Sequence, residues 1–317
     1  MFSLDCLHKA QAEIYRHMPA TAQYSWPLLN ERAGKQLWIK HENHTPTGAF
    51  KVRGGLLYMA RLKASGFKGG LVTATRGNHG QSIGLAGKKM GIPVTIVVPE
   101  GNSLEKNAAM RALGAELIIH GKDFDEARAH AAHLSKTRGL QSVPSFHPDL
   151  VIGVATYAYE FFENAPNLDK VYVPIGMGSG ICGMIRTRDL MGLKTKVIAV
   201  ISENAPAYAL SLEKGEIVQT ETANTFADGV ACRQPDPLAF DMVKAGADHI
   251  VQVSDDEIKA AIRAYYTDTH NVAEGAGAVG LAGLLQEIKS GACDADERLG
   301  TVLSGGNIDM DMFKNII

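Results

Sequence analysis

The sequence is poor in cysteine and has no excess of charge of either sign. Its 317 residues include four cysteines, and 32 lysines and arginines stand against 34 aspartates and glutamates. The cysteines form no Cys-x-x-Cys pair and have no histidine cluster at the spacing of zinc ligands. We therefore expect reduced thiols and no zinc site. The balanced charge gives no reason to expect nucleic acid or an anionic membrane as a partner.

The sequence also lacks a long hydrophobic run. No apolar stretch approaches the ~20 residues that a membrane-spanning helix needs. The first twenty residues mix charged and apolar positions at helical spacing, unlike a secretory signal. These features predict a cytoplasmic protein without membrane contact.

Short β-rich segments alternate along the chain with amphipathic segments. Residues 69–75 and 93–99 are β-rich, and residues 79–91 and 103–114, which follow them, have helical spacing. The alternation continues through 116–121, 124–139, 170–176, 196–202 and 205–215. This pattern predicts a doubly wound α/β fold, in which mostly parallel sheets are flanked by helices on both faces.

Two glycine-rich turns, near residues 76–80 and 176–183, follow predicted strands. Ligands of open parallel sheets bind at the carboxyl ends of the strands, so we expect both turns to face one cleft between two lobes. The chain is long enough for two domains.

Two of four motifs could bind a phosphorylated cofactor. In PTGAFKVRGG (46–55), Lys51 lies between apolar neighbours, where burial would favour the neutral amine that forms a Schiff base. Most such lysines are nevertheless surface residues. In VPIGMGSGICG (173–183), glycines and Ser179 precede a predicted helix and could bind a phosphate. Glu203, after the next strand, loosely fits a dinucleotide site, so a nicotinamide-dependent dehydrogenase stays open at this point.

The other two motifs are less specific on their own. TATRGNHGQS (73–82) places Asn78 and His79 at the end of a strand, where they could hold a carboxylate or simply begin a helix. TVLSGGNID (301–309) ends a strand on Ser304 and two glycines, which is equally compatible with an ordinary turn.

Taken together and in order, the four motifs resemble the fold-type II pyridoxal-phosphate enzymes, in the branch of serine/threonine dehydratases and serine racemases. The resemblance extends from WPLLNERAGKQLWIKHENHTPTGAFKVRG to LSGGNID, nearly the whole chain. It implies that the protein uses pyridoxal 5'-phosphate to convert L-threonine-type or L-serine-type 3-hydroxy amino acids to 2-oxo acids and ammonia. With this resemblance, we predict a large cofactor-binding domain formed by residues 1–69 and 148–317 and a small mobile domain over residues 70–147. Family habit also suggests a homodimer.

The resemblance implies a role for each motif. Lys51 would carry the cofactor and act as the general base, Phe50 would pack beside its ring, and Ser304 would face the pyridine nitrogen. Asn78 would contact the phenolic oxygen, and Glu274 would lie near the cofactor, although a helix-capping role is equally open to it. The phosphate would be held by Gly176, Met177, Gly178, Ser179 and Gly180. The substrate carboxylate would be held by Thr75, Asn78 and His79.

Arg76 departs from the pattern of the family. Relatives usually have serine or alanine at this position, and the serine acts as the second acid and base of a racemase. Arginine stays protonated and cannot take a proton, so we predict weak or no racemisation. Arg76 either binds the side chain of the substrate or lies on the surface and points away from the cleft. In the first case the substrate would be 3-hydroxyaspartate or phenylserine.

A dehydratase specialised for L-threo-phenylserine or 3-hydroxyaspartate is therefore the alternative function. A serine racemase, a β-replacing transferase and a nicotinamide-dependent dehydrogenase are less favoured.

The sequence gives only a partial match to a cation site of some relatives. Glu203 and Ala207 occupy its first two places, but Ala209 stands where an aspartate is needed. A divalent cation is therefore doubtful, with Glu203 and Asp228 as the remaining possible ligands. Because the last motif lies close to Ile317, we also expect no appended regulatory domain.

Overall fold

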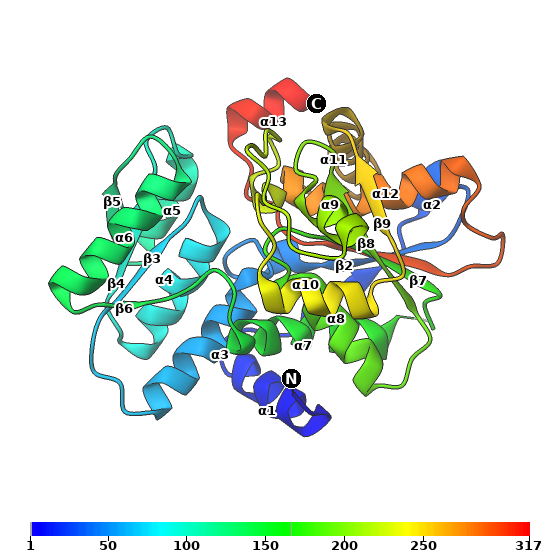
Figure 1. Cartoon of the computed structure of the whole chain (residues 1–317). Coiled ribbons are helices and arrows are strands. Elements are labelled where there is room, and N and C mark those ends of the chain that lie inside the picture. The colour runs from blue at the N-terminus through cyan, green and yellow to red at the C-terminus, as the bar shows by residue number, and fades with distance from the viewer. Residues whose placement is uncertain (1, 166) are drawn as a thin grey trace.

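A computed structural model describes residues 2–165 and 167–317. It contains a six-stranded and a four-stranded sheet, each covered by helices (Figure 1). The α/β fold predicted from the alternating pattern is confirmed. Within the described part of the chain, no helix is both long enough and apolar enough to cross a membrane.

The six-stranded sheet has the order β1-β2-β10-β7-β8-β9. All neighbouring strands pair in parallel except β1, which is antiparallel to β2. The strands are β1 (Gln23–Tyr24), β2 (Leu37–His41), β7 (Lys170–Pro174), β8 (Lys196–Ser202), β9 (Ile250–Val253) and β10 (Leu299–Leu303).

Helices cover both faces of this sheet, as the nearly continuous burial of its central strands requires. One face packs against α1 (Leu4–Tyr15), α7 (Pro148–Asn164), α8 (Ser179–Leu190) and α10 (Pro237–Gly246). The other packs against α2 (Pro27–Ala33), α11 (Asp255–Thr269), α12 (Gly275–Ser290) and α13 (Met310–Ile316). The short helix α9 (Ala207–Lys214) follows β8.

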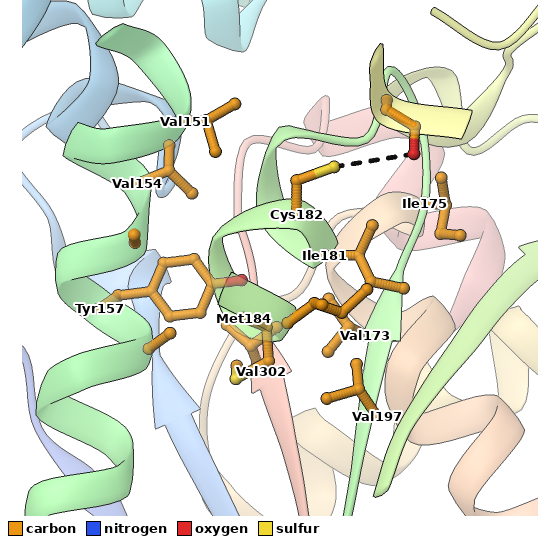
Figure 2. Close-up of a cluster of buried hydrophobic side chains, with 14 of the residues drawn as sticks. Val151, Val154, Tyr157, Val173, Ile175, Ile181, Cys182, Met184, Val197 and Val302 are labelled. Atoms are coloured by element: carbon orange, nitrogen blue, oxygen red, sulfur yellow. Dashed lines mark hydrogen bonds between the residues drawn. The ribbon is translucent and has the colours of Figure 1, made fainter. Parts of the chain in front are cut away.

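Figure 2 shows why the first face is buried. Apolar side chains of α7 and α8 meet there above alternate residues of three neighbouring strands. The side chains drawn include Val151, Val154, Tyr157, Val173, Ile181, Met184, Val197 and Val302. This core fixes α8 on the sheet, so the loop that precedes α8 is held at the carboxyl end of β7.

The four-stranded sheet is entirely parallel, with the order β5-β4-β3-β6. Its strands are β3 (Leu71–Ala74), β4 (Val94–Val98), β5 (Glu116–Ile119) and β6 (Gln141–Ser142). One face packs against α3 (Lys51–Ala64), α4 (Asn78–Met90) and α5 (Leu104–Ala112), and the other against α6 (Phe124–Arg138). Because α3 begins at Lys51 and covers this sheet, the lysine lies where the two sheets meet. The predicted mobility of residues 70–147 stays a prediction.

Candidate active site

The loop before Lys51 runs beside the loop that follows β10. The backbone N–H of Phe50 donates to the carbonyl of Ser304 at 3.0 Å, and the N–H of Gly306 donates to the carbonyl of Gly48 at 2.9 Å. Ala49 and Gly305 form an isolated β-bridge between the same two loops. The first and last motifs of the sequence therefore lie side by side at the carboxyl edge of the large sheet.

Lys51 projects from the first turn of α3 into this region. Its Nζ donates to the Oγ of Ser179 at 3.2 Å and lies 5.1 Å from the centre of the Phe50 ring. Burial lowers the pKa of Lys51 to about 8. The Oγ of Ser82 donates to the main-chain carbonyl of Lys51 at 2.6 Å, which fixes the start of α3 against α4. The Lys51 amine is therefore buried, and part of it is deprotonated near neutral pH.

The glycines of the loop between β7 and α8 allow other groups to approach its backbone closely. Gly178 has φ +98°, a left-handed conformation that side chains strain to adopt. A Cβ on Gly176 would lie 2.0 Å from the carbonyl oxygen of Gly229. No side chain of the described residues caps α8, which begins at Ser179. The first N–H groups of α8 therefore remain available to an anion, as a phosphate site requires.

Two further members of this loop pack against their surroundings. The Oη of Tyr157 donates to the carbonyl of Gly180 at 3.2 Å. The Sγ of Cys232 lies 4.0 Å from the Sδ of Met177. Both contacts hold the loop against neighbouring parts of the large sheet and its helices.

Asn78 is held by hydrogen bonds at both ends of its amide. Its Nδ2 donates to the Oε1 of Glu274 at 2.5 Å, and its Oδ1 accepts from the Nδ2 of Asn307 at 2.8 Å. Asn307 also donates to the carbonyl of Thr47 at 2.7 Å. The second carboxylate oxygen of Glu274 lies 3.5 Å from the Nζ of Lys106. Burial raises the pKa of Glu274, and Lys106 opposes this shift.

These contacts decide the local role of Glu274. Its side chain makes no capping bond to α12, although Glu274 stands at the N-cap position. The carboxyl group instead fixes Asn78 from the opposite side of the cleft. Asn307 and Lys106 were not singled out from the sequence. Asn307 lay within a motif that was recognised, but nothing in the segment around Lys106 indicated a site residue.

Thr75 and His79 shape the turn between β3 and α4. The Oγ1 of Thr75 accepts from the N–H groups of Gly77 at 3.0 Å and Gly80 at 3.3 Å, so this hydroxyl stabilises the turn itself. His79 is buried, and its Nε2 has no hydrogen-bond partner among the described residues. Burial, together with the charge of Lys51, lowers the pKa of His79 to about 3, which keeps the ring neutral.

Arg76 extends from the same turn across the cleft. Its Nη1 donates to the Oδ1 of Asp228 at 2.9 Å. Asp228 opens a 3₁₀ helix, η2 (Asp228–Val230), which belongs to the large part of the chain between β8 and β9. Arg76 therefore points to the opposite wall of the cleft, its side chain is 48% exposed, and its contact with a substrate stays a prediction.

Ser304 follows β10 and is buried, and its Oγ donates to the carbonyl of Ala276 at 3.4 Å. A small cavity of about 40 Å³ lies between the two walls, and its lining includes Ser103, Lys106, Asp228, Glu274, Asn307 and Asp309. Among the described residues, no group of three or more His, Cys, Asp or Glu side chains is arranged to hold a metal ion. Glu203 itself is exposed at the surface.

The comparisons with known proteins agree with this arrangement. A family model described as pyridoxal-phosphate dependent enzyme matches residues 16–305. The L-threonine ammonia-lyase of Thermotoga maritima is 36% identical over 100% of this chain and 78% of its own length. The biosynthetic L-threonine dehydratase of Haemophilus influenzae is 31% identical over 99% of this chain and 61% of its own length.

Solved structures of similar proteins have the same fold over nearly the whole chain. The processed threonine deaminase isoform 2 of Solanum lycopersicum has a TM-score of 0.91 at 30% identity, covering 99% of this chain and 93% of that chain. Maize serine racemase has a TM-score of 0.92 at 26% identity, covering 99% of this chain and 96% of that chain.

Proposed function

Because the chain belongs to the pyridoxal-phosphate dependent enzymes, we propose that it is a hydroxy-amino-acid dehydratase of the threonine/serine type. It eliminates water from L-threonine or L-serine, and the resulting enamine tautomerises to an imine, which takes up water and releases ammonia to leave a 2-oxo acid. The observation that carries this proposal is Lys51, whose amine lies between the Phe50 ring and Ser179 at the glycine-rich loop. The names of the relatives favour threonine over a specialised substrate.

The residues present fit pyridoxal phosphate. The uncapped start of α8 and the loop from Gly176 to Gly180 would hold its phosphate. Phe50 would pack beside its ring, and Ser304 would face the ring nitrogen. Asn78, fixed by Glu274 and Asn307, would bond its phenolic oxygen.

Lys51 and Ser304 have separate roles in the elimination. When bound, the cofactor draws electrons from the α-carbon of the attached amino acid and makes the α-proton acidic. Lys51 takes this proton, because burial lowers its pKa to about 8 and a free amine is therefore populated near neutral pH. Ser304 offers only a neutral hydroxyl to the ring nitrogen. The electron pair left at the α-carbon is then best discharged by expelling the β-hydroxyl group, which takes up a proton and leaves as water.

The turn between β3 and α4 would hold the substrate carboxylate. Helix α4 begins at Asn78, and the Thr75 hydroxyl accepts from the N–H of Gly80 in its first turn, but no side chain of the described residues bonds the N–H groups of Asn78 and His79. The N–H groups of Asn78 and His79 can therefore bond an anion, and Thr75 keeps the turn in shape. The neutral His79 ring adds no competing positive charge beside Lys51.

A borohydride experiment and a substrate panel test the proposed function. Reduction of the purified yellow protein should leave a cofactor adduct on Lys51, and Lys51→Ala should abolish both the adduct and the release of 2-oxo acid from L-threonine. Lys89→Ala, which replaces an exposed lysine of α4, is the control and should behave as the parent protein. A colourless parent protein that binds nicotinamide would refute the proposal. So would a yellow protein that releases no 2-oxo acid from either L-threonine or L-serine.

We also propose that the enzyme acts in the cytoplasm as a homodimer. The resemblance to the fold-type II family supports this assembly. Light scattering on the purified protein would measure it directly, and a monomer at micromolar concentration would contradict it.

A further inference from the structure

Arg76 and Asp228 form an ion pair that joins the two walls of the cleft. The distance between Nη1 and Oδ1 is 2.9 Å, and the side chains are 48% and 36% exposed. Arg76 follows a strand of the four-stranded sheet, whereas Asp228 lies between two strands of the six-stranded sheet. The guanidinium therefore enters the cleft already paired with a carboxylate from the other side.

The backbone holds Asp228 firmly in place. The next residue, Gly229, approaches the glycine-rich loop so closely that a Cβ on Gly176 would lie 2.0 Å from its carbonyl oxygen. Before η2, the Oγ1 of Thr225 accepts from the N–H of Ala227 at 3.2 Å and donates to Asp255 at 2.6 Å. The position of the Asp228 carboxylate thus depends on packing against the predicted phosphate loop, and not on the ion pair alone.

A second ion pair also joins the two walls of the cleft, with its cation on the same wall as Arg76. Lys106 and Glu274 lie 3.5 Å apart, and both are largely buried. In each pair the cation comes from the segment that carries the four-stranded sheet and the anion from the segment that carries the six-stranded sheet. Asp228 also contributes to raising the pKa of Glu274, so the two carboxyl groups are close enough to interact. Lys106, Glu274 and Asp228 all line the cavity between the walls, and Arg76 reaches its edge through the ion pair with Asp228.

We propose that Asp228 determines the substrate class of the proposed dehydratase by compensating the charge of Arg76. With this partner in place, the site favours 3-hydroxy amino acids whose side chains are uncharged. An acidic side chain would have to displace Asp228 from Arg76 and would lie close to the Asp228 carboxylate, which repels it. Without the Asp228 charge, Arg76 would offer a free guanidinium, the group best suited to bind a second carboxylate in bidentate fashion.

Asp228→Asn is the variant that tests this inference, because it removes the charge and keeps the shape of the side chain. The measured quantity is kcat/KM for L-threo-3-hydroxyaspartate divided by kcat/KM for L-threonine, in the holoenzyme. We expect this ratio to rise about tenfold or more, since one hydrogen-bonded charge contact is worth about 1.5–3 kcal/mol. The double variant Arg76→Ala/Asp228→Asn should lose the gain, because the gain requires the free guanidinium.

Asp125→Asn is the matched control. Asp125 pairs with Arg233 at 2.8 Å, also between the two parts of the chain, and both side chains are similarly exposed. Its replacement should leave the ratio unchanged. An unchanged ratio in Asp228→Asn, or a parent enzyme that already prefers hydroxyaspartate, would overturn the inference.

A binding measurement separates this inference from the proposed function. L-Aspartate and L-2-aminobutyrate differ in side-chain charge and lack the β-hydroxyl that elimination requires. Equilibrium dialysis should show stronger binding of L-aspartate relative to L-2-aminobutyrate in Asp228→Asn than in the parent holoenzyme. If this shift occurs but no variant releases 2-oxo acid, the dehydratase function fails and the role of Asp228 stands. If the shift does not occur, the inference is wrong whatever the activity.

Discussion

The guanidinium of Arg53 donates to both carboxylate oxygens of Glu42, at 2.7 and 2.9 Å, although neither side chain is exposed to solvent. Arg53 also pairs with Glu160 at 2.6 Å, and Glu160 accepts from the Nζ of Lys40 at 2.6 Å. This buried cluster contains two cations and two anions, so its formal charge is balanced. It ties the first turn of α3, two residues after Lys51, to α7 and to the segment that follows β2.

We expect Arg53→Met to destabilise the protein strongly. Removing one member of a buried ion pair leaves an uncompensated charge, at a cost of about 3–5 kcal/mol. Urea unfolding should show this loss as a lower midpoint. Arg61→Met on the same helix is the control, because Arg61 and its partner Asp149 are partly exposed and such pairs contribute about 0–1 kcal/mol.

The double variant Arg53→Met/Glu42→Leu tests the reason for that loss. It leaves Lys40 and Glu160 as a balanced pair, so it should be more stable than Arg53→Met alone. If the double variant were the less stable protein, packing around Arg53 and not charge balance would explain the effect.

Covalent capture of the cofactor should depend on pH with a midpoint set by Lys51. Burial lowers the pKa of this amine to about 8, and only the free amine attacks an aldehyde. The rate at which the apoprotein binds pyridoxal phosphate covalently should therefore rise with pH and level off above about 8. Stopped-flow absorbance would measure this rate. A rate that continued to rise toward pH 10.5, the ordinary value for lysine, would show that the amine is solvated.

The sequence predicted the central strands well because their signal is local. The strand β8 is an apolar run that is buried at six of its seven residues, and such runs are typical of parallel sheets. The strands β1 and β6 have only two residues each, too few for any period to appear. They form because a neighbouring strand is already in place, which cannot be read from the segment itself.

Part of the site could likewise be predicted and part could not. The motifs around Lys51 and Ser304 were recognised together, and the structure places their loops side by side. The partners of the site residues are a different matter. Asn307 lies 229 residues from Asn78, and Asp228 lies 152 residues from Arg76. No local pattern links such pairs, so the direction of Arg76 stayed open until the fold placed Asp228 opposite it.

Asn307 should be required for the orientation of Asn78. In Asn307→Asp, a carboxylate replaces the amide that donates to the carbonyl of Thr47 and to the Oδ1 of Asn78. The carboxylate would repel both of these oxygen atoms. We expect both variants to lower the affinity of the apoprotein for pyridoxal phosphate. The loss should be about 1–3 kcal/mol for Asn307→Ala, because the two acceptors are left unpaired. It should be larger for Asn307→Asp. Titration followed by cofactor absorbance measures this affinity. Equal affinities in Asn307→Ala and the parent would show that Asn78 needs no such support.

His249 should make the stability of the fold depend on pH. Its ring lies between Asp248, at 2.9 Å from Nδ1, and Glu287, at 2.6 Å from Nε2, and so ties the start of β9 to α12. Partial burial opposes the charged form, but these two carboxylates raise the pKa of His249 above its ordinary 6.5. A raised pKa means that the folded state binds the proton more tightly than the unfolded state does. The resulting stabilisation is complete below pH 6.5 and is lost as the pH rises through the pKa of the folded state.

His249→Gln should therefore melt at a lower temperature than the parent protein at pH 6, and the difference should shrink toward pH 9. Glu287 keeps a partner in this variant, because it also accepts from the Oη of Tyr172 at 2.6 Å, so the comparison reports on the imidazolium and not on a stranded carboxylate. His133→Gln replaces an exposed histidine of α6 and serves as the control. High salt should reduce the difference at pH 6, because a partly exposed charge cluster is screened. A difference in melting temperature that is the same at pH 6 and pH 9 would show that the ring acts by packing and hydrogen bonding in its neutral form.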